Sequence, residues 1–255
     1  MREVSLESWE DVLERVESIT RSLEQIYDAE LVSSLETVGL GRVFPTEEFL
    51  ENDKLALVLK QVVTKGYNVP VVVVERDADY FVLDGHHRCY VFRKLQHDTA
   101  SAYIIRFPVG RQYRDVPKRS IEDLPIKEVS TIEDPILRAW QRTFSILKHY
   151  EAIYAVSFYL RKDHVKIADL VPTQSHVGRM QVEAIKQLLV PITCVQHLDR
   201  YYILDGHARA VRARQLGQEA VDVMVLVPAV PIGFGIVKTA EEMNFRGMDD
   251  LKIRE

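Results

Sequence analysis

Residues 84–88 read Asp-Gly-His-His-Arg (DGHHR) and separate two segments of different pattern. The apolar run Tyr80–Leu83 precedes them and predicts a strand, whereas residues 89–95 follow with the pattern of a helix. The free N–H groups of a first helical turn and the helix dipole both favour an anion at that position. The stretch therefore predicts a strand–turn–helix element that binds a phosphate.

The same element occurs a second time, because residues 205–209 read DGHAR between an apolar run and a helical pattern. Other landmarks repeat in the same order. Tyr27 and Tyr154 are 127 residues apart, as are Thr46 and Thr173, whereas Asp84 and Asp205 are 121 apart. Several matches at nearly one offset predict two copies of one unit, the first with six more residues after Thr46.

Each copy is expected to begin with a helix, near Ser5 or Ser8 in the first and in the segment Thr131–Pro135 in the second. The predicted order then continues strand, helix, two-stranded hairpin, DGH turn, helix and last strand. We expect these elements in the two copies at residues 38–44 and 165–171 (strand), 48–64 and 177–189 (helix), 71–74 and 192–195 (strand), and 102–107 and 221–227 (last strand).

The chain of 255 residues has 47% hydrophobic and 28% charged residues and a net charge of -5, a composition typical of a soluble globular protein. Residues 1–127 contain 17 Lys and Arg against 22 Asp and Glu, and the remaining residues are balanced. This argues against a broad nucleic-acid surface but leaves a local basic patch open. No apolar run is long enough to span a membrane, so we expect no membrane partner and a cytoplasmic location.

The order of these motifs, including Pro45-Thr46-Glu47 and its counterpart Pro172-Thr173-Gln174, resembles the ParB/sulfiredoxin superfamily. The resemblance covers roughly Val38–Arg114 and Val165–Val230. It implies an α/β fold of two tandem units, each a small mixed sheet with helices, related by a pseudo-twofold axis. We expect domains at 1–127 and 128–255, and either a monomer with an internal pseudo-dimer or a homodimer.

Members of this superfamily hold nucleotide phosphates with the DGH-type turn. The sequence DGHHR is similar to the sequence of this turn in free serine kinases of this fold. In that branch a Glu after Pro-x is the base, which implies this role for Glu47. Asp84 matches the second acidic residue of the kinase site. Gly85, His86, His87 and Arg88 match the phosphate-binding turn. The resemblance implies ATP or ADP as cofactor, with Mg²⁺ bridging its phosphates and Asp84 as a possible ligand.

The second copy departs from the kinase pattern, with Gln174 in place of Glu47 and Ala208 in place of His87. Because glutamine cannot accept a proton as a general base, we expect chemistry only in the first unit. The second unit keeps a smaller set that either binds a phosphate or only completes the fold: Asp205, Gly206, His207 and Arg209.

A simpler interpretation remains for each residue. Asp84 is then only a helix cap, His86–Arg88 a solvated first turn, and Glu47 an acidic residue favoured by a helix dipole. Three functions also stay open: a nucleotide-dependent phosphotransferase on a small hydroxylated metabolite such as free serine, a nucleotide-binding ParB-like regulatory or DNA-associated protein, and a nuclease. The sequence does not distinguish ATP from ADP or identify the acceptor.

Overall fold

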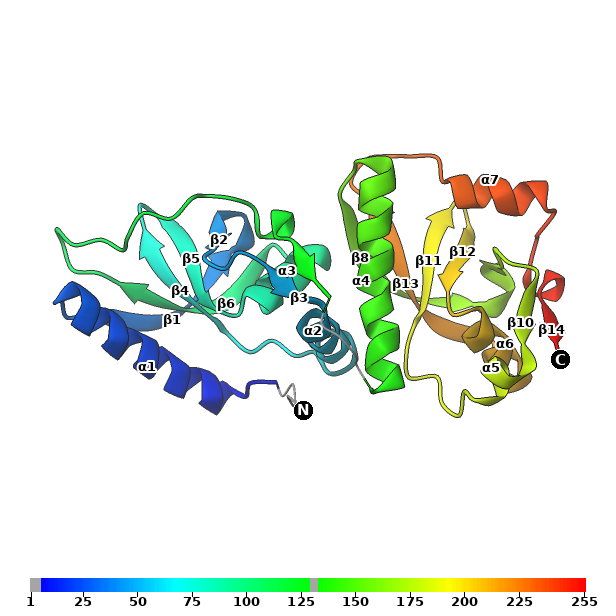
Figure 1. The fold of residues 1–255 in the computed structure, drawn as a ribbon, viewed down its shortest axis with the longest axis horizontal. Helices are drawn as coiled ribbons and strands as arrows, with labels where there is room; N and C mark the ends of the chain where they lie inside the picture. Colours follow the sequence, from blue (N-terminus) through cyan, green and yellow to red (C-terminus); the bar gives the residue numbers. More distant parts are fainter. Residues whose placement is uncertain (1–5, 129–132) are drawn as a thin grey trace. The chain divides into compact units, whose positions relative to one another are not determined.

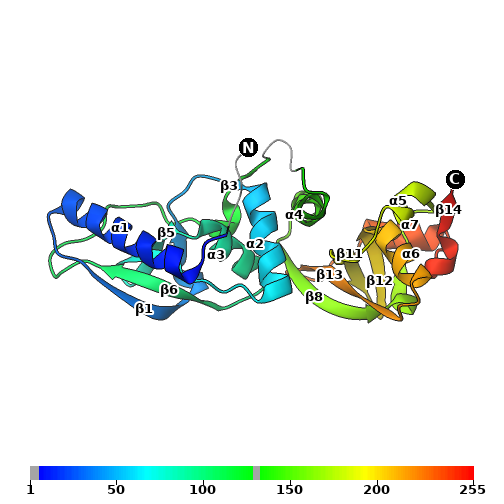
Figure 2. The same ribbon diagram turned by 90° about the horizontal axis from the view of Figure 1, so that it is seen from below.

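A computed structural model describes residues 6–128 and 133–255 (Figures 1 and 2). The chain divides into two compact units, Met1–Gln141 and Arg142–Glu255, and the division falls inside the helix α4 (Pro135–Tyr154). Each unit contains a five-stranded mixed sheet, and the strand order is the same in both: β1-β6-β4-β5-β2 and β8-β13-β11-β12-β9. The predicted fold class, two similar α/β units in tandem, is confirmed.

In the first unit the central strand β4 pairs antiparallel with β5 and parallel with β6, and the edge strands β1 and β2 complete the sheet. Its four residues Val71–Val74 are fully buried, as expected of a strand covered on both faces. The strands of this sheet are β1 (Val32–Gly39), β2 (Val43–Pro45), β4 (Val71–Arg76), β5 (Asp79–Asp84) and β6 (Thr99–Arg106).

The second sheet repeats these pairings strand for strand. Each unit also has a small parallel two-stranded sheet, formed by β3 with β7 in the first and by β10 with β14 in the second. The strands are β8 (Phe158–Lys166), β9 (Leu170–Val171), β11 (Ile192–His197), β12 (Arg200–Asp205) and β13 (Ala220–Pro228), and in the small sheets β3 (Leu50–Glu51), β7 (Ile126–Lys127), β10 (His176–Gly178) and β14 (Lys252–Arg254).

The helix α1 (Trp9–Tyr27) begins after Ser8, which forms a reciprocal capping box with Asp11. The prediction of a helix start at Ser8 is confirmed, while Ser5, Thr131 and Ile132 lie outside the described residues. The other helices are α2 (Asn52–Lys65), α3 (His86–Lys94), α5 (Arg179–Glu183), α6 (His207–Gln215) and α7 (Gly235–Glu242), with 3-10 segments at Leu40–Arg42, Ile121–Asp123, Ile167–Asp169 and Met248–Asp250.

One side of α1 packs on the first sheet, where Val12, Val16 and Leu23 join a core cluster with Val72 and Ile105. The helix therefore lies along the sheet, as Figures 1 and 2 show. A core cluster of the second unit includes Cys194 and Ala210, residues of the central strand and of the helix after the turn. Both cysteines of the chain, Cys89 and Cys194, are buried free thiols.

Two predicted helices are wrong in extent. Residues 177–189 contain only the five-residue α5, because Val177 and Gly178 pair with β14 and because this copy has six residues fewer than the first. Residues 48–51 are likewise not helical, since Leu50 and Glu51 pair with β7. The predicted single strands 38–44 and 165–171 are each interrupted by a 3-10 segment.

Candidate functional site

The DGH turn has the same backbone geometry in both units. A register shift between Val72 and Val73 places a bulge opposite Asp84, and Gly85 then adopts a φ of 96° before α3 begins. The second unit has a matching shift between Thr193 and Cys194, and Gly206 has a φ of 101°. A β-bulge redirects the end of a strand, and a positive φ favours glycine. Together the bulge and the glycine set the direction in which the following helix begins.

Arg88 folds back over this glycine and forms an ion pair with Asp84, at 2.5 Å between Nη2 and Oδ2. Its Nη1 lies 2.9 Å from Glu7 Oε2, and only 4% of its side chain is exposed. Arg209 repeats the bond to Asp205 at 2.8 Å. The interpretation of a solvated first turn is therefore wrong for Arg88, and the N-cap position of α3 belongs to Gly85 and not to Asp84.

His86 connects the turn to the Pro-Thr-Glu segment. Its Nε2 accepts hydrogen bonds from the backbone N–H groups of Thr46 (3.1 Å) and Glu47 (3.2 Å). His207 accepts the corresponding bond from Thr173 at 3.1 Å. Burial is the main cause that lowers the pKa of His86 to about 3 and that of His207 to about 4. Both imidazoles are therefore neutral acceptors that hold a loop, which explains why this residue is present in both copies.

His87 has a similar state but a different partner. Its Nε2 accepts a hydrogen bond from the backbone N–H of Glu51 at 3.0 Å. Burial first, and then the charge of Lys54, lowers its pKa to about 4. The His87 imidazole is thus neutral at pH 7. With Nε2 as acceptor the proton lies on Nδ1, which can still donate to an anionic oxygen.

These histidines predict an acid-sensitive fold. An unfolded chain protonates histidine near pH 6.5, whereas the folded protein resists protonation of His86, His87 and His207 until about pH 3 to 4. Between these values the unfolded chain binds more protons, so their contribution to stability is complete above pH 6.5 and is lost as pH falls. We expect the thermal unfolding midpoint to decrease between pH 7.5 and pH 5. His149→Gln, at an exposed position, should leave this slope unchanged, and a flat profile would contradict the prediction.

A pocket of about 270 Å³ lies at the first DGH turn. We call it the DGHHR pocket. It brings together all the residues that the sequence predicted for the first unit. Other lining residues come from α1, α2 and the segment before α1. Its lining consists of Leu6, Glu7, Arg15, Glu47, Lys54, Leu57, Val58, Tyr67, Asp84, Gly85, His86, His87 and Arg88. Helix α3 therefore begins at the pocket.

Glu47 is held by its backbone and leaves its carboxylate accessible. His86 accepts from its N–H, and the guanidinium of Arg119 donates to its carbonyl oxygen. Its Oε1 lies 3.5 Å from His86 Nδ1, and 51% of the side chain is exposed. Burial is the main cause that raises the pKa of this carboxyl, and Asp84 and Glu51 raise it further against the opposing charge of Lys54.

Sequence reasoning missed four polar residues of the DGHHR pocket: Glu7, Arg15, Lys54 and Tyr67. Tyr67 connects Glu7 with the predicted Arg88, because its hydroxyl donates to the Glu7 carbonyl oxygen at 3.0 Å and accepts from Arg88 at 3.3 Å. For Arg15 a signal was present, since it lies 127 residues before Arg142. Glu7 also has an acidic residue, Asp134, at the same offset, whereas Lys54 and Tyr67 have no matching residue in the second copy.

The second DGH turn has a different environment. Asp205 binds Arg209 through Oδ2 and Arg142 through Oδ1, the latter at 3.1 Å. Burial raises the pKa of Asp205, but the charges and hydrogen bonds of Arg209 and Arg142 together outweigh burial and lower this pKa below its ordinary value. Gln174 donates to the His176 carbonyl oxygen at 2.9 Å. This turn is thus closed by an arginine of its own leading helix.

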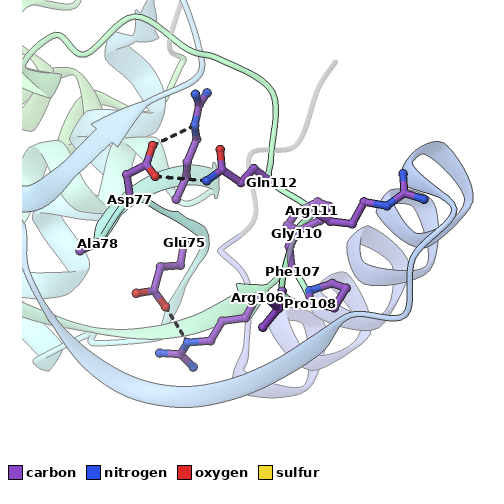
Figure 3. A pocket seen from close by; sticks show the side chains of 11 residues that line it. Glu75, Asp77, Ala78, Arg106, Phe107, Pro108, Gly110, Arg111 and Gln112 are labelled. Atoms are coloured by element: carbon purple, nitrogen blue, oxygen red, sulfur yellow. Dashed lines mark hydrogen bonds and ion pairs between the residues drawn. The ribbon is translucent and has the colours of Figure 1, made fainter.

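A larger pocket of the first unit, about 540 Å³, lies at the opposite end of the hairpin, where β4 turns into β5 (Figure 3). Its charges are paired within the protein: Arg106 lies 2.6 Å from Glu75, and Asp77 binds both Arg76 and Gln112. Figure 3 shows the Arg111 side chain pointing away from these carboxylates. Its larger size therefore does not make this pocket the candidate functional site, and the DGHHR pocket is the better candidate.

No protein-family model matches the chain. The uncharacterized protein MJ0188 of Methanocaldococcus jannaschii is 35% identical over 117 residues, which cover 43% of this chain and 43% of that protein. The match thus spans less than half the length of this relative. Among solved structures, sulfiredoxin from Arabidopsis thaliana matches with a TM-score of 0.24 and 21% identity, covering 28% of this chain and 83% of that one.

A Pnob8-like ParB-N domain matches with a TM-score of 0.27 and 16% identity, covering 49% of this chain and 50% of that one. Sulfiredoxin and ParB are the proteins that the motif order resembles, but at these identities and TM-scores neither match supports a conclusion about this chain. No helix of the described residues is long and apolar enough to cross a membrane.

Proposed function

We propose that the first unit is a nucleotide-dependent phosphotransferase that uses ATP or ADP to phosphorylate a small hydroxylated metabolite such as free serine. The observation that carries this proposal is the accessible Glu47 carboxylate beside the first turn of α3 in one pocket. This arrangement supports a base for the acceptor beside a binding site for the donor phosphate. The similarity of DGHHR to the sequence of the corresponding turn in free serine kinases supports the choice of acceptor.

In the proposed reaction Glu47 accepts the proton of the acceptor hydroxyl while the oxygen of that hydroxyl bonds to the terminal phosphorus of the nucleotide. The bond from that phosphorus to the leaving oxygen breaks, and the shortened nucleotide keeps the electron pair. Phosphoryl transfer depends mainly on positioning and on charge stabilisation. The backbone N–H groups at the start of α3 and the Nδ1–H of His87 would donate to the transferred group, since residues 86–88 line the pocket.

The donor chemistry of the DGHHR pocket also fits Mg²⁺. This ion binds proteins through one or two carboxylates and keeps the substrate phosphates and water as its other ligands. Glu7, Glu47 and Asp84 all line the pocket, and the Asp84 charge raises the pKa of both glutamates. Asp84 would hold the ion, which would neutralise phosphate charge, and Glu47 stays available as the base. The described residues contain no group of three or more His, Cys, Asp or Glu side chains able to hold a metal by themselves.

The test is to incubate the full chain and Mg²⁺ with ATP or ADP and with serine, threonine or other small alcohols, and to follow phosphorus by NMR. We expect nucleotide consumption that depends on the acceptor, with a new phosphomonoester as product. Nucleotide that stays intact with every acceptor, or is consumed without one, would remove the proposal. Salt-sensitive duplex binding would then favour the regulatory function, and DNA cleavage lost in Asp84→Asn would favour the nuclease.

A further inference from the structure

Arg15 is the least satisfied cation of the DGHHR pocket. Arg88 is buried against Asp84 and Glu7, and Lys54 forms an ion pair with Glu51, the residue that precedes its helix α2. Arg15 lies 3.7 Å from Glu7, and 54% of its side chain is exposed. A guanidinium group has five N–H donors, so most of the capacity of Arg15 is unused among the residues that the structure describes.

The second unit shows what this helix position can reach. Arg142 lies 127 residues after Arg15, and Tyr154 lies 127 after Tyr27, so α1 and α4 correspond residue by residue. Arg142 Nη1 donates to Asp205 Oδ1 at 3.1 Å, on the other oxygen from Arg209. An arginine at this position of the leading helix therefore reaches the carboxylate of the DGH turn within one unit.

In the first unit a carboxylate of the chain itself lies between the two arginines. Glu7 Oε2 is 2.9 Å from Arg88, and Glu7 Oε1 is 3.7 Å from Arg15. The residue 127 positions later, Asp134, instead accepts from the Ile136 N–H at 2.8 Å and serves its own helix start. The first unit has thus gained an internal anion at its pocket, and the second unit has no counterpart in the same role.

We infer that Arg15 is a further ligand-binding residue, and that a carboxylate or phosphate group of the ligand replaces the Glu7 carboxylate beside Arg15 and Arg88. The inference deepens the proposed function and rests on it for the identity of the ligand. An arginine fork matches both planar carboxylate and phosphate, so the group is either the carboxylate of an amino-acid acceptor or a phosphate of the nucleotide.

The experiment compares Arg15→Gln with Arg21→Gln, which removes the same charge at an exposed position of the same helix. We expect Arg15→Gln to raise one KM by roughly 10- to 100-fold, as for a lost charge-assisted hydrogen bond, with little change in kcat. A rise in the acceptor KM assigns Arg15 to the carboxylate, and a rise in the nucleotide KM assigns it to the phosphate. Arg15→Lys should recover part of the loss, and Arg21→Gln should behave as the parent.

Direct binding separates this inference from the proposed function. Calorimetric titration with ATP or ADP and with serine requires no turnover, and we expect Arg15→Gln to weaken one of these ligands while Glu7→Gln, which removes the competing charge, strengthens it. Unchanged KM values in an active enzyme overturn the inference. Equal affinities of parent and Arg15→Gln for all ligands, or no binding by either protein, overturn it whether or not transfer is observed.

Discussion

Replacement of Glu47 by glutamine is expected to abolish phosphoryl transfer and to leave nucleotide affinity nearly intact. The carboxylate is the group that takes the acceptor proton in the proposed reaction, and loss of a general base lowers kcat by roughly 10²- to 10⁴-fold. The glutamine side chain has the same size and keeps the hydrogen bond from its backbone N–H to His86. The measurement is single-turnover transfer together with calorimetric nucleotide affinity.

The chain itself shows that this variant can fold. Gln174 occupies the equivalent position of the second unit, and the Thr173–His207 contact beside it matches that of Thr46 and His86. A loss of transfer in Glu47→Gln therefore reports chemistry and not unfolding. Glu48→Gln is the matched control, because it makes the same change at the next, exposed residue.

The pH profile gives a second readout for the base. Burial raises the pKa of Glu47, so the fraction of ionised carboxylate decreases as pH falls through this raised value. We expect kcat/KM to fall on the acid side of the profile in the parent enzyme, and the residual rate of Glu47→Gln to lack this limb. Equal loss of transfer and of nucleotide affinity in the variant would remove the base assignment.

The sequence predicted the parts of the site that depend on local pattern. A glycine between an apolar run and a helical run is enough to place the turn, and the repeat confirmed its position in both copies. The role of His86 was not predictable, since its partners are amide groups 40 and 39 residues away. Pattern marks an anion-binding turn, but only tertiary structure shows that this histidine and Arg88 are already committed to protein contacts.

The contribution of α1 was missed for the same reason. The periodicity of its apolar residues predicts a helix with a buried side, but periodicity does not state which sheet that side covers. Only the packing of Val12 and Val16 on β4 brings Arg15 and Glu7 to the DGHHR pocket. The short parallel pairs β3–β7 and β10–β14 escaped prediction as well, because two- or three-residue strands have no recognisable period.

Gly85→Ala is expected to destabilise the first unit by roughly 3 kcal/mol, from backbone strain at positive φ combined with overpacking. Gly85 has a φ of 96°, and an added Cβ would lie 2.8 Å from Arg88 Nε and 2.8 Å from Val71 Cγ1. Val71 cannot withdraw, because it is fully buried in the central strand. Moving Arg88 instead would break its bonds to Asp84 and Glu7.

Two other glycines separate these causes when urea unfolding midpoints are compared. Gly66 has a φ of 64° with nothing within 4 Å of the new Cβ, so Gly66→Ala reports backbone strain alone, about 1 kcal/mol. At Gly206 the close contacts all come from the movable Arg209 side chain, so Gly206→Ala should fall between the two. Equal losses in Gly85→Ala and Gly66→Ala would contradict the prediction, because the turn would then tolerate a side chain. In that case the contacts of Arg88 with Asp84 and Glu7 would not be needed for stability, and Arg88 would be available to bind a phosphate.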